Sequence, residues 1–107
     1  MSNVFKAIAD PTRRQVLALL RERPMSAGDL AAAFDHSKPT MSAHFNVLRE
    51  AGLIDATRNG KSIVYRLRMS VLEEALMGLA ATVGLDFARG QPLAVPAPDP
   101  NFEESES

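Results

Sequence analysis

Residues 37–67 read SKPTMSAHFNVLREAGLIDATRNGKSIVYRL, and no other stretch of the chain says as much about its architecture. The first half predicts a helix, because Met41, Phe45 and Leu48 recur at helical spacing and form one apolar stripe. Ser37 stands where a capping side chain would accept a hydrogen bond from the first turn of this helix. The stretch therefore opens with a helix that has one side for burial and one side for solvent.

The second half predicts a β-hairpin. Gly52 is the expected end of the helix, and two arms follow it, residues 53–58 and residues 61–67. Asn59 and Gly60 form the dipeptide most typical of a tight hairpin, so we expect the turn at these two residues. A helix followed by a hairpin with a basic tip is the pattern of a winged helix-turn-helix, whose helix enters a DNA groove.

The second arm of the hairpin alternates between apolar and mixed side chains. Ile63, Tyr65 and Leu67 fall on one side of the strand. We therefore expect these three residues to form the buried face of the hairpin.

Four further helices are predicted around this stretch. A short helix over residues 3–9 is followed by a second over residues 11–23, with Asp10 at its cap. Ser26 caps a third helix, and a last helix is expected near residues 70–84. The fold class is therefore mainly α with a small β-hairpin, in the order α-α-α-α-β-β-α.

Length and composition suit one compact domain, since the chain has 107 residues and 46% of them are hydrophobic. We expect this domain to span residues 1–87. From residue 88 onward four prolines and an acidic end, EESES, predict a mostly disordered tail over residues 88–107. The chain shows neither a signal-peptide pattern nor an apolar run near the roughly 20 residues of a membrane span. We therefore expect a cytoplasmic protein that is not inserted in a membrane.

The formal net charge of −1 conceals an uneven distribution. Residues 37–68 carry six basic side chains against two acidic ones, whereas residues 88–107 carry one basic side chain against four acidic ones. Local charge governs attraction to phosphate more than the total charge does. The helix and hairpin are therefore the part of the chain suited to DNA.

Several classes of site and function find no support in the residues. The chain has no cysteine, which excludes a disulfide framework, a cysteine nucleophile and a thiolate metal site. His36 and His44 are eight residues apart without a suitable acid nearby, and would make a poor zinc site. There is no glycine-rich phosphate loop and no paired histidine and carboxylate at a useful spacing. We therefore expect no metal, no cofactor and no enzymatic activity.

If the apolar stripe is buried, the opposite face of the helix is left to read DNA. Polar side chains there can hydrogen-bond to base edges, small apolar ones can contact thymine methyl groups, and the helix start suits a phosphate. The basic hairpin tip suits phosphates or the minor groove. An ordinary solvated surface is the alternative interpretation of both. The expected DNA-binding residues are Ser37, Lys38, Pro39, Thr40, Ser42, Ala43, His44, Asn46, Arg58, Asn59 and Lys61.

Three side chains have two open interpretations. His44 lies beside the apolar stripe, so it either packs inside the helix-turn-helix or reaches a phosphate at the groove edge. Arg13 and Arg14 either contact the DNA backbone or pair with Asp10 or another acid. The sequence does not choose between these alternatives.

Three segments together resemble the ArsR family of bacterial transcriptional repressors: VFKAIADPTRRQVLALL, SKPTMSAHFNVLREAGLI and RNGKSIVYRL. The resemblance covers about residues 3–84, and the opening is most similar to the SdpR-like autorepressor branch of that family. It implies a homodimeric repressor that binds an inverted-repeat operator in double-stranded DNA, and control of its own promoter fits that branch. It also implies dimerisation through the first and last helices, at the faces of Val4, Phe5, Ile8, Leu72, Leu76, Leu79 and Val83.

The chain departs from the metal-sensing members of that family. Residues 25–28 read MSAG where those members carry a cysteine pair, and residues 70–85 contain no histidine. The resemblance therefore implies a metal-independent repressor, whose inducer or protein partner the sequence does not identify. The alternative hypothesis is a winged-helix protein-interaction module, because the exposed centre of the DNA-reading helix carries no arginine or glutamine.

Overall fold

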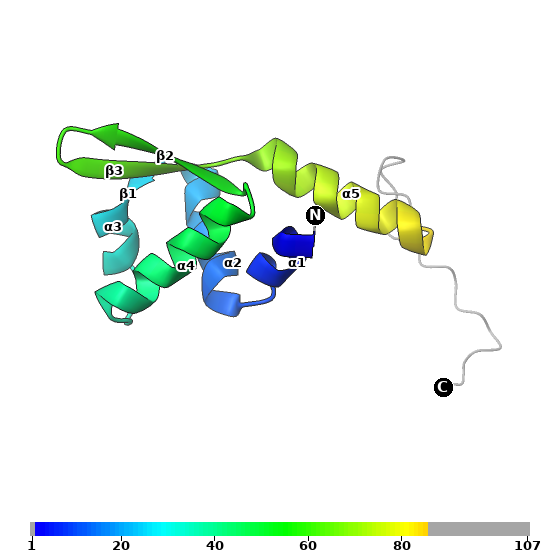
Figure 1. Cartoon of the computed structure of the whole chain (residues 1–107), viewed down its shortest axis with the longest axis horizontal. Helices are drawn as coiled ribbons and strands as arrows, with labels where there is room; N and C mark the ends of the chain where they lie inside the picture. The colour runs from blue at the N-terminus through cyan, green and yellow to red at the C-terminus, as the bar shows by residue number, and fades with distance from the viewer. Residues whose placement is uncertain (1, 86–107) are drawn as a thin grey trace. The chain divides into compact units, whose positions relative to one another are not determined.

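The computed structural model of the chain describes residues 2–85 (Figure 1). Five helices and three strands follow one another along this part of the chain. They are α1 (Ser2–Ile8), α2 (Pro11–Glu22), β1 (Met25–Ser26), α3 (Ala27–Ala32), α4 (Lys38–Glu50), β2 (Ile54–Asn59), β3 (Ser62–Leu67) and α5 (Met69–Val83). The predicted class, mainly α with a β-hairpin, is confirmed. The tail predicted at residues 88–107 lies outside the described residues.

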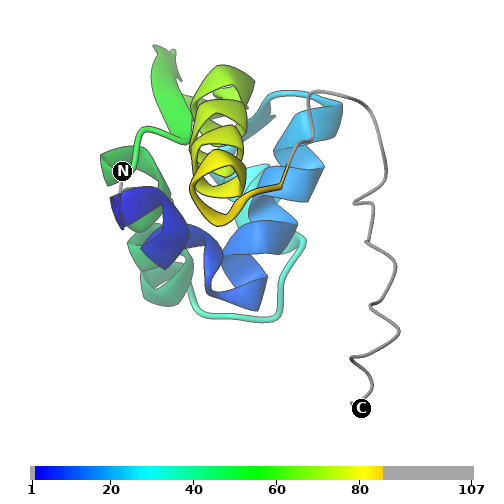
Figure 2. The ribbon, with the colours of Figure 1, turned by 90° about the vertical axis from the view of Figure 1, so that its right-hand side faces the viewer.

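The core is formed by the apolar stripes of the helices and the base of the hairpin. The stripe of α4 is fully buried, as predicted, with Met41 and Leu48 inaccessible and Phe45 nearly so. Burying each such side chain stabilises the fold by roughly 1.5–3 kcal/mol. Tyr65 of β3 lies against Phe45, with ring centroids 5.0 Å apart. The turned view in Figure 2 shows α1 beside both α2 and α4, which it contacts.

Both ends of α4 are closed by local hydrogen bonds. At the start, the Ser37 hydroxyl oxygen accepts the backbone N–H of Thr40 at 3.2 Å, so the predicted cap is confirmed. At the end, Gly52 adopts a φ of 78°. Its N–H donates to the Arg49 carbonyl at 2.9 Å, and the next N–H, of Leu53, donates to the Leu48 carbonyl at 3.0 Å. This pair of hydrogen bonds needs a residue in the left-handed conformation, which glycine adopts without strain.

The hairpin turn is one residue later than predicted. Asn59 pairs with Ser62 as the last rung of the ladder, so Gly60 and Lys61 form the two-residue loop. Gly60 has a φ of 67°, whereas Lys61 does not have a positive φ. A glycine with positive φ at the first central position is typical of a type II′ turn, in contrast to the type I′ turn that Asn-Gly favours. Lys61 is therefore in the turn itself and does not flank it.

The sheet has a third strand that the sequence did not predict. β1 pairs antiparallel with β3, giving the strand order β1-β3-β2. Its two residues, Met25 and Ser26, are too few to show alternation, and they pair because β3 offers them a free edge. The buried face predicted for β3 is wrong at one residue. Tyr65 is buried and Leu67 half-buried, but Ile63 is 36% exposed. Ile63 pairs with Arg58 on the second rung from the turn, in the outer part of the hairpin, where the paired residues are exposed.

The last helix, α5, is apolar around much of its circumference. Leu76 is 39% exposed, Leu79 46% and Val83 60%. Leucine and valine side chains at such exposure leave an apolar surface in contact with water. None of the helices between residues 2 and 85 combines the length and the apolar character that a membrane crossing needs.

Candidate nucleic-acid interface

The outward face of α4 carries small and polar side chains. The residues on this face are all exposed: Lys38, Pro39, Thr40, Ser42, Ala43 and Asn46. Val47 is half-buried and packs against the core. The helix is therefore divided cleanly between a side that holds it in place and a side that is open to a partner.

The start of α4 presents an organised hydroxyl pair. Besides capping the helix, the Ser37 hydroxyl donates to the Thr40 Oγ1 at 2.9 Å. The Ser37 hydroxyl is thus occupied both as acceptor and as donor. Because the Thr40 oxygen already accepts one hydrogen bond, its own O–H is free to donate outward. Thr40 is accordingly the better placed of the two to bond an anion or a base acceptor.

The tip of the hairpin is basic and open to solvent. Arg58 and Asn59 at the end of β2 are both exposed, and so is Lys61 in the turn. Arg58 and Asn59 are the last two residues of β2, and Lys61 directly precedes Ser62, the residue of β3 that pairs with Asn59. The hairpin thus presents two cations, Arg58 and Lys61, within four residues at its tip.

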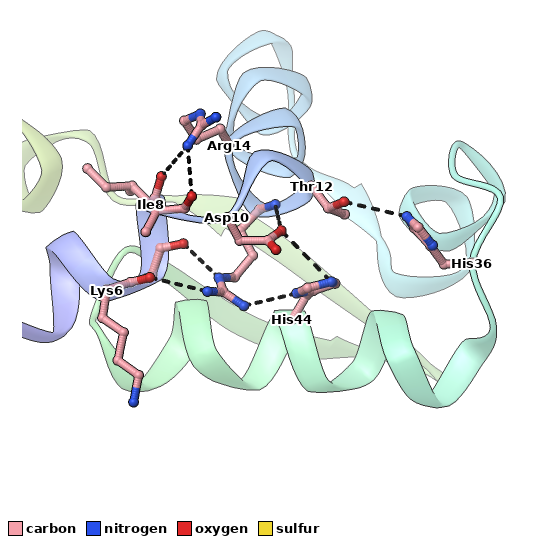
Figure 3. Close-up of polar contacts among 10 residues, drawn as sticks. Lys6, Ile8, Asp10, Thr12, Arg14, His36 and His44 are labelled. Atoms are coloured by element: carbon pink, nitrogen blue, oxygen red, sulfur yellow. Dashed lines mark hydrogen bonds and ion pairs between the residues drawn. The ribbon is translucent and has the colours of Figure 1, made fainter.

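Arg13 and Arg14 have a role that neither interpretation of the sequence included. Figure 3 shows the Arg14 guanidinium turned toward Ile8 at the end of α1, and the hydrogen bonds of Arg13 also go to the end of that helix. The Arg13 Nε donates to the Ala7 carbonyl at 2.6 Å, and its Nη2 donates to the Lys6 carbonyl at 3.2 Å. The Arg14 Nη1 donates to the Ile8 carbonyl at 2.8 Å. The last carbonyls of a helix have no hydrogen-bond donor within the helix, and these two arginine side chains donate to them.

His44 packs inside the subunit. Its side chain is 16% exposed, and both ring nitrogens face groups of the same chain (Figure 3). Nδ1 lies 3.1 Å from the Arg13 Nη1, and Nε2 lies 4.0 Å from the Asp10 Oδ2. Of the two alternatives, the structure favours packing, so His44 leaves the set of residues that are open to a phosphate. The sequence could not show this, because Arg13 is 31 residues away.

Asp10 closes the same cluster. Its Oδ2 accepts the backbone N–H of Arg13 at 3.1 Å, which caps α2. Partial burial acts to raise the pKa of the Asp10 carboxyl, but the backbone bond from Arg13 and the nearby His44 outweigh it, so that the pKa is lowered. The carboxylate is therefore held in its charged form between α1, α2 and α4.

The other expected roles are distributed as follows. His36 is exposed, and its Nε2 lies 3.4 Å from the Thr12 hydroxyl. Within residues 2–85, no three histidine, aspartate or glutamate side chains gather where they could hold a metal ion.

Val4 of α1 is only 4% exposed and belongs to the core of its own subunit, so it offers almost no surface to a second copy. Phe5, Ile8 and Leu72 are half-buried.

A helix-turn-helix formed by α3 and α4, followed by the β2–β3 wing, defines the winged helix-turn-helix class of DNA-binding domains. The comparisons with known proteins agree with this class. Residues 10–56 match the model of the arsR family of bacterial regulatory proteins. The chain is 49% identical over 76 residues to the transcriptional repressor SdpR of Bacillus subtilis, an alignment that covers 71% of this chain and 84% of that protein. The chain therefore belongs to the arsR family.

Solved structures give the same result. The crystal structure of an ArsR family transcriptional regulator matches with a TM-score of 0.71 and 29% identity, and covers 78% of this chain and 91% of that one. The solution structure of the homodimeric winged helix-turn-helix DNA-binding domain of a possible ArsR-family regulator from Mycobacterium bovis matches with a TM-score of 0.63 and 29% identity, covering 78% and 79%. These relatives are transcriptional regulators, which agrees with the prediction that the chain is not an enzyme.

Proposed function

We propose that this protein is a transcriptional repressor that binds an inverted-repeat operator as a homodimer, does not need a metal ion, and controls its own promoter. The observation that carries the proposal is the outward face of α4, where every side chain from Lys38 to Asn46 outside the buried stripe is small or polar and, apart from His44, exposed. The major groove of DNA admits one such helix. Membership of the arsR family supports the same function.

Base reading would fall to the centre of this face. Ser42 and Asn46 are exposed side chains that can bond to base edges, and Asn is suited to adenine. Ala43 can contact a thymine methyl group. With no arginine at the centre of this face, between Thr40 and Asn46, each base contact there is weak, so affinity has to come largely from phosphates and from the pairing of two subunits.

Phosphate binding would fall to the edges of the surface. Lys38 stands in the first turn of α4, beside the free hydroxyl hydrogen of Thr40 and the positive end of the helix dipole. Arg58 and Lys61 at the wing tip would reach the backbone farther along the duplex. Together these contacts would fix the register of α4 in the groove.

The homodimer is supported by the homodimeric relative from Mycobacterium bovis and by the exposed Leu76, Leu79 and Val83 of α5. A two-fold dimer binds a two-fold site, so the operator would be an inverted repeat with half-sites roughly 34 Å apart, one helical turn. Metal independence is supported by Met25, Ser26, Ala27 and Gly28, none of which carries a thiolate. Control of its own promoter is supported by the similarity to SdpR.

The test starts from the promoter of the protein's own gene. Protection mapping should reveal two half-sites, and a labelled duplex that contains them should bind the protein equally well with and without a chelator. Ser42→Ala should weaken binding to this duplex about tenfold, as expected for one base contact, while binding to a scrambled duplex stays unchanged. Ser70→Ala, at an exposed position in the first turn of α5 and outside the proposed surface, is the matched control. No protected site, together with capture of a protein partner, would favour the protein-interaction module.

A further inference from the structure

The cluster of Asp10, Arg13 and His44 joins the start of α2 to the middle of α4, two places that are 31 residues apart in the sequence. Asp10 precedes α2, Arg13 lies in its first turn, and His44 lies in the middle of α4 (Figure 3). Through Arg13 the cluster also reaches the last carbonyls of α1. Among residues 2–85, the contact of Arg13 with His44 is the one side-chain hydrogen bond between α2 and α4. The link acts on the DNA-reading helix from its inner side.

The chemistry of the two groups fixes the protonation state of the histidine. An arginine guanidinium has only donors, so the Nδ1 of His44, 3.1 Å away, must be the acceptor. The proton of the neutral ring then lies on Nε2, which faces the Asp10 carboxylate at 4.0 Å. The contact with Arg13 thus exists only while His44 is neutral. A protonated ring would turn an N–H and a positive charge toward the guanidinium.

The charged groups around the ring come from every element packed against it. Arg13 faces it from α2, Asp10 from the turn before α2, and the His36 ring from the turn before α4, with centroids 6.5 Å apart. Lys6 of α1 contributes its carbonyl to Arg13, and its ammonium group points away from the ring in Figure 3. An imidazolium would be repelled by Arg13 and attracted by Asp10. Protonation should therefore break the link to Arg13, and with it the connection to the last carbonyls of α1, and draw the ring toward the Asp10 carboxylate.

We infer that His44 is a positioning residue for DNA binding, whose neutral Nδ1 fixes the recognition helix against Arg13 and the end of α1, so that its protonation weakens operator binding. The inference rests on the proposed function. Phe5 and Ile8 on α1 are expected to face a second copy, so the same link would also set the position of each recognition helix relative to the dimer interface. Histidine side chains change charge between about pH 5 and pH 8, a range that cells reach.

The test compares variants in a His36→Asn background, which removes the other histidine of the chain. His44→Asn places an amide oxygen near the position of Nδ1 and can still accept from Arg13, but it does not titrate. Asn and His have similar helix propensities, so the change leaves α4 otherwise matched. His44→Leu removes the acceptor altogether. Affinity for the operator duplex and for a scrambled duplex is measured from about pH 7.5 to about pH 5.5, the interval over which histidine gains its charge.

We expect the His44 protein to lose operator affinity by about tenfold as the pH falls, the size of one charge-assisted hydrogen bond, while the His44→Asn protein stays flat. His44→Leu should bind the operator about tenfold more weakly at every pH, with unchanged dimerisation and unchanged binding to the scrambled duplex. The direction is informative, because a histidine that touched phosphate would instead bind more tightly at low pH.

Identical pH profiles for the His44 and His44→Asn proteins would overturn the inference. So would a His44→Leu variant with the operator affinity of the parent. If His44→Leu does not fold, as judged by circular dichroism, the comparison of the other two proteins still decides. Failure of the wild-type protein to prefer the operator at any pH would overturn the proposed function as well.

Discussion

The salt dependence of operator binding can be calculated from the exposed cations of the proposed surface. Lys38 on α4, and Arg58 and Lys61 on the wing, give three exposed cations in each subunit and twice that number in a dimer. Each phosphate neutralised by a cation releases condensed counterions and contributes about −0.9 to the slope of log K against log salt. With all of these cations engaged the slope should be about −5.4, so doubling the salt concentration should weaken binding roughly 40-fold.

Lys61→Gln tests the contribution of the wing tip alone. The change removes two phosphate contacts from the dimer, so the slope should fall to about −3.6 and a doubling of salt should weaken binding only about 12-fold. Fluorescence anisotropy of a labelled operator between about 0.1 and 0.4 M KCl measures both slopes. Arg23→Gln is the matched control, because Arg23 is exposed at the end of α2, outside the proposed surface. A wild-type slope shallower than about −2, or the same slope for Lys61→Gln and wild type, would refute the assignment of these cations to phosphates.

Two further predictions concern stability. Leu48→Ala leaves a cavity at a fully buried position of α4. It should lower the free energy of unfolding, measured in urea, by about 2–5 kcal/mol with little change in the denaturant slope. A loss below about 1 kcal/mol would mean that the core around α4 is loosely packed. Asp10 has a lowered pKa in the folded protein, so its charged form stabilises the fold above the unfolded pKa of about 3.9, and this contribution is lost as the pH falls through the folded value. Asp10→Asn keeps a capping oxygen without the titration, so its stability deficit should be larger at neutral pH than at about pH 3, and an equal deficit at both would contradict the pKa argument.

The helices and their caps were predicted from local sequence because their causes are local. Apolar residues three or four apart share one face of a helix, so the stripe of Met41, Phe45 and Leu48 already indicates which side of α4 is buried. Ser37 and Gly52 act on backbone groups within a few residues of themselves, and the structure has both in the expected roles. Once the buried side of α4 is known, the side chains on the opposite side of the helix are identified as the exposed ones.

The hairpin shows how a local rule can be off by one residue. Asn-Gly favours the type I′ turn, but the pairing of Asn59 with Ser62 moves the reversal to Gly60 and Lys61. The register of a hairpin depends on which residues of both strands reach the core, and Ile54 and Tyr65, which are buried, satisfy it in the observed pairing. The two-residue β1 depends on the edge of β3, which no feature of its own sequence could indicate.

The amino-acid sequence alone was enough to indicate the family, the helices and the face of α4 that is open to solvent, because periodicity, capping residues and matching segments are properties of neighbouring residues. The inner cluster was settled only by the tertiary structure. His44 had two equal interpretations, and the choice between them depended on Arg13 and Asp10, more than 30 residues away in the chain. Arg13 could have contacted the DNA backbone or paired with an acid, yet its Nε, Nη1 and Nη2 contact the end of α1 and His44. Which charge faces a partner and which is used inside the subunit depends on how the helices pack, and packing brings together groups that the order of residues keeps apart.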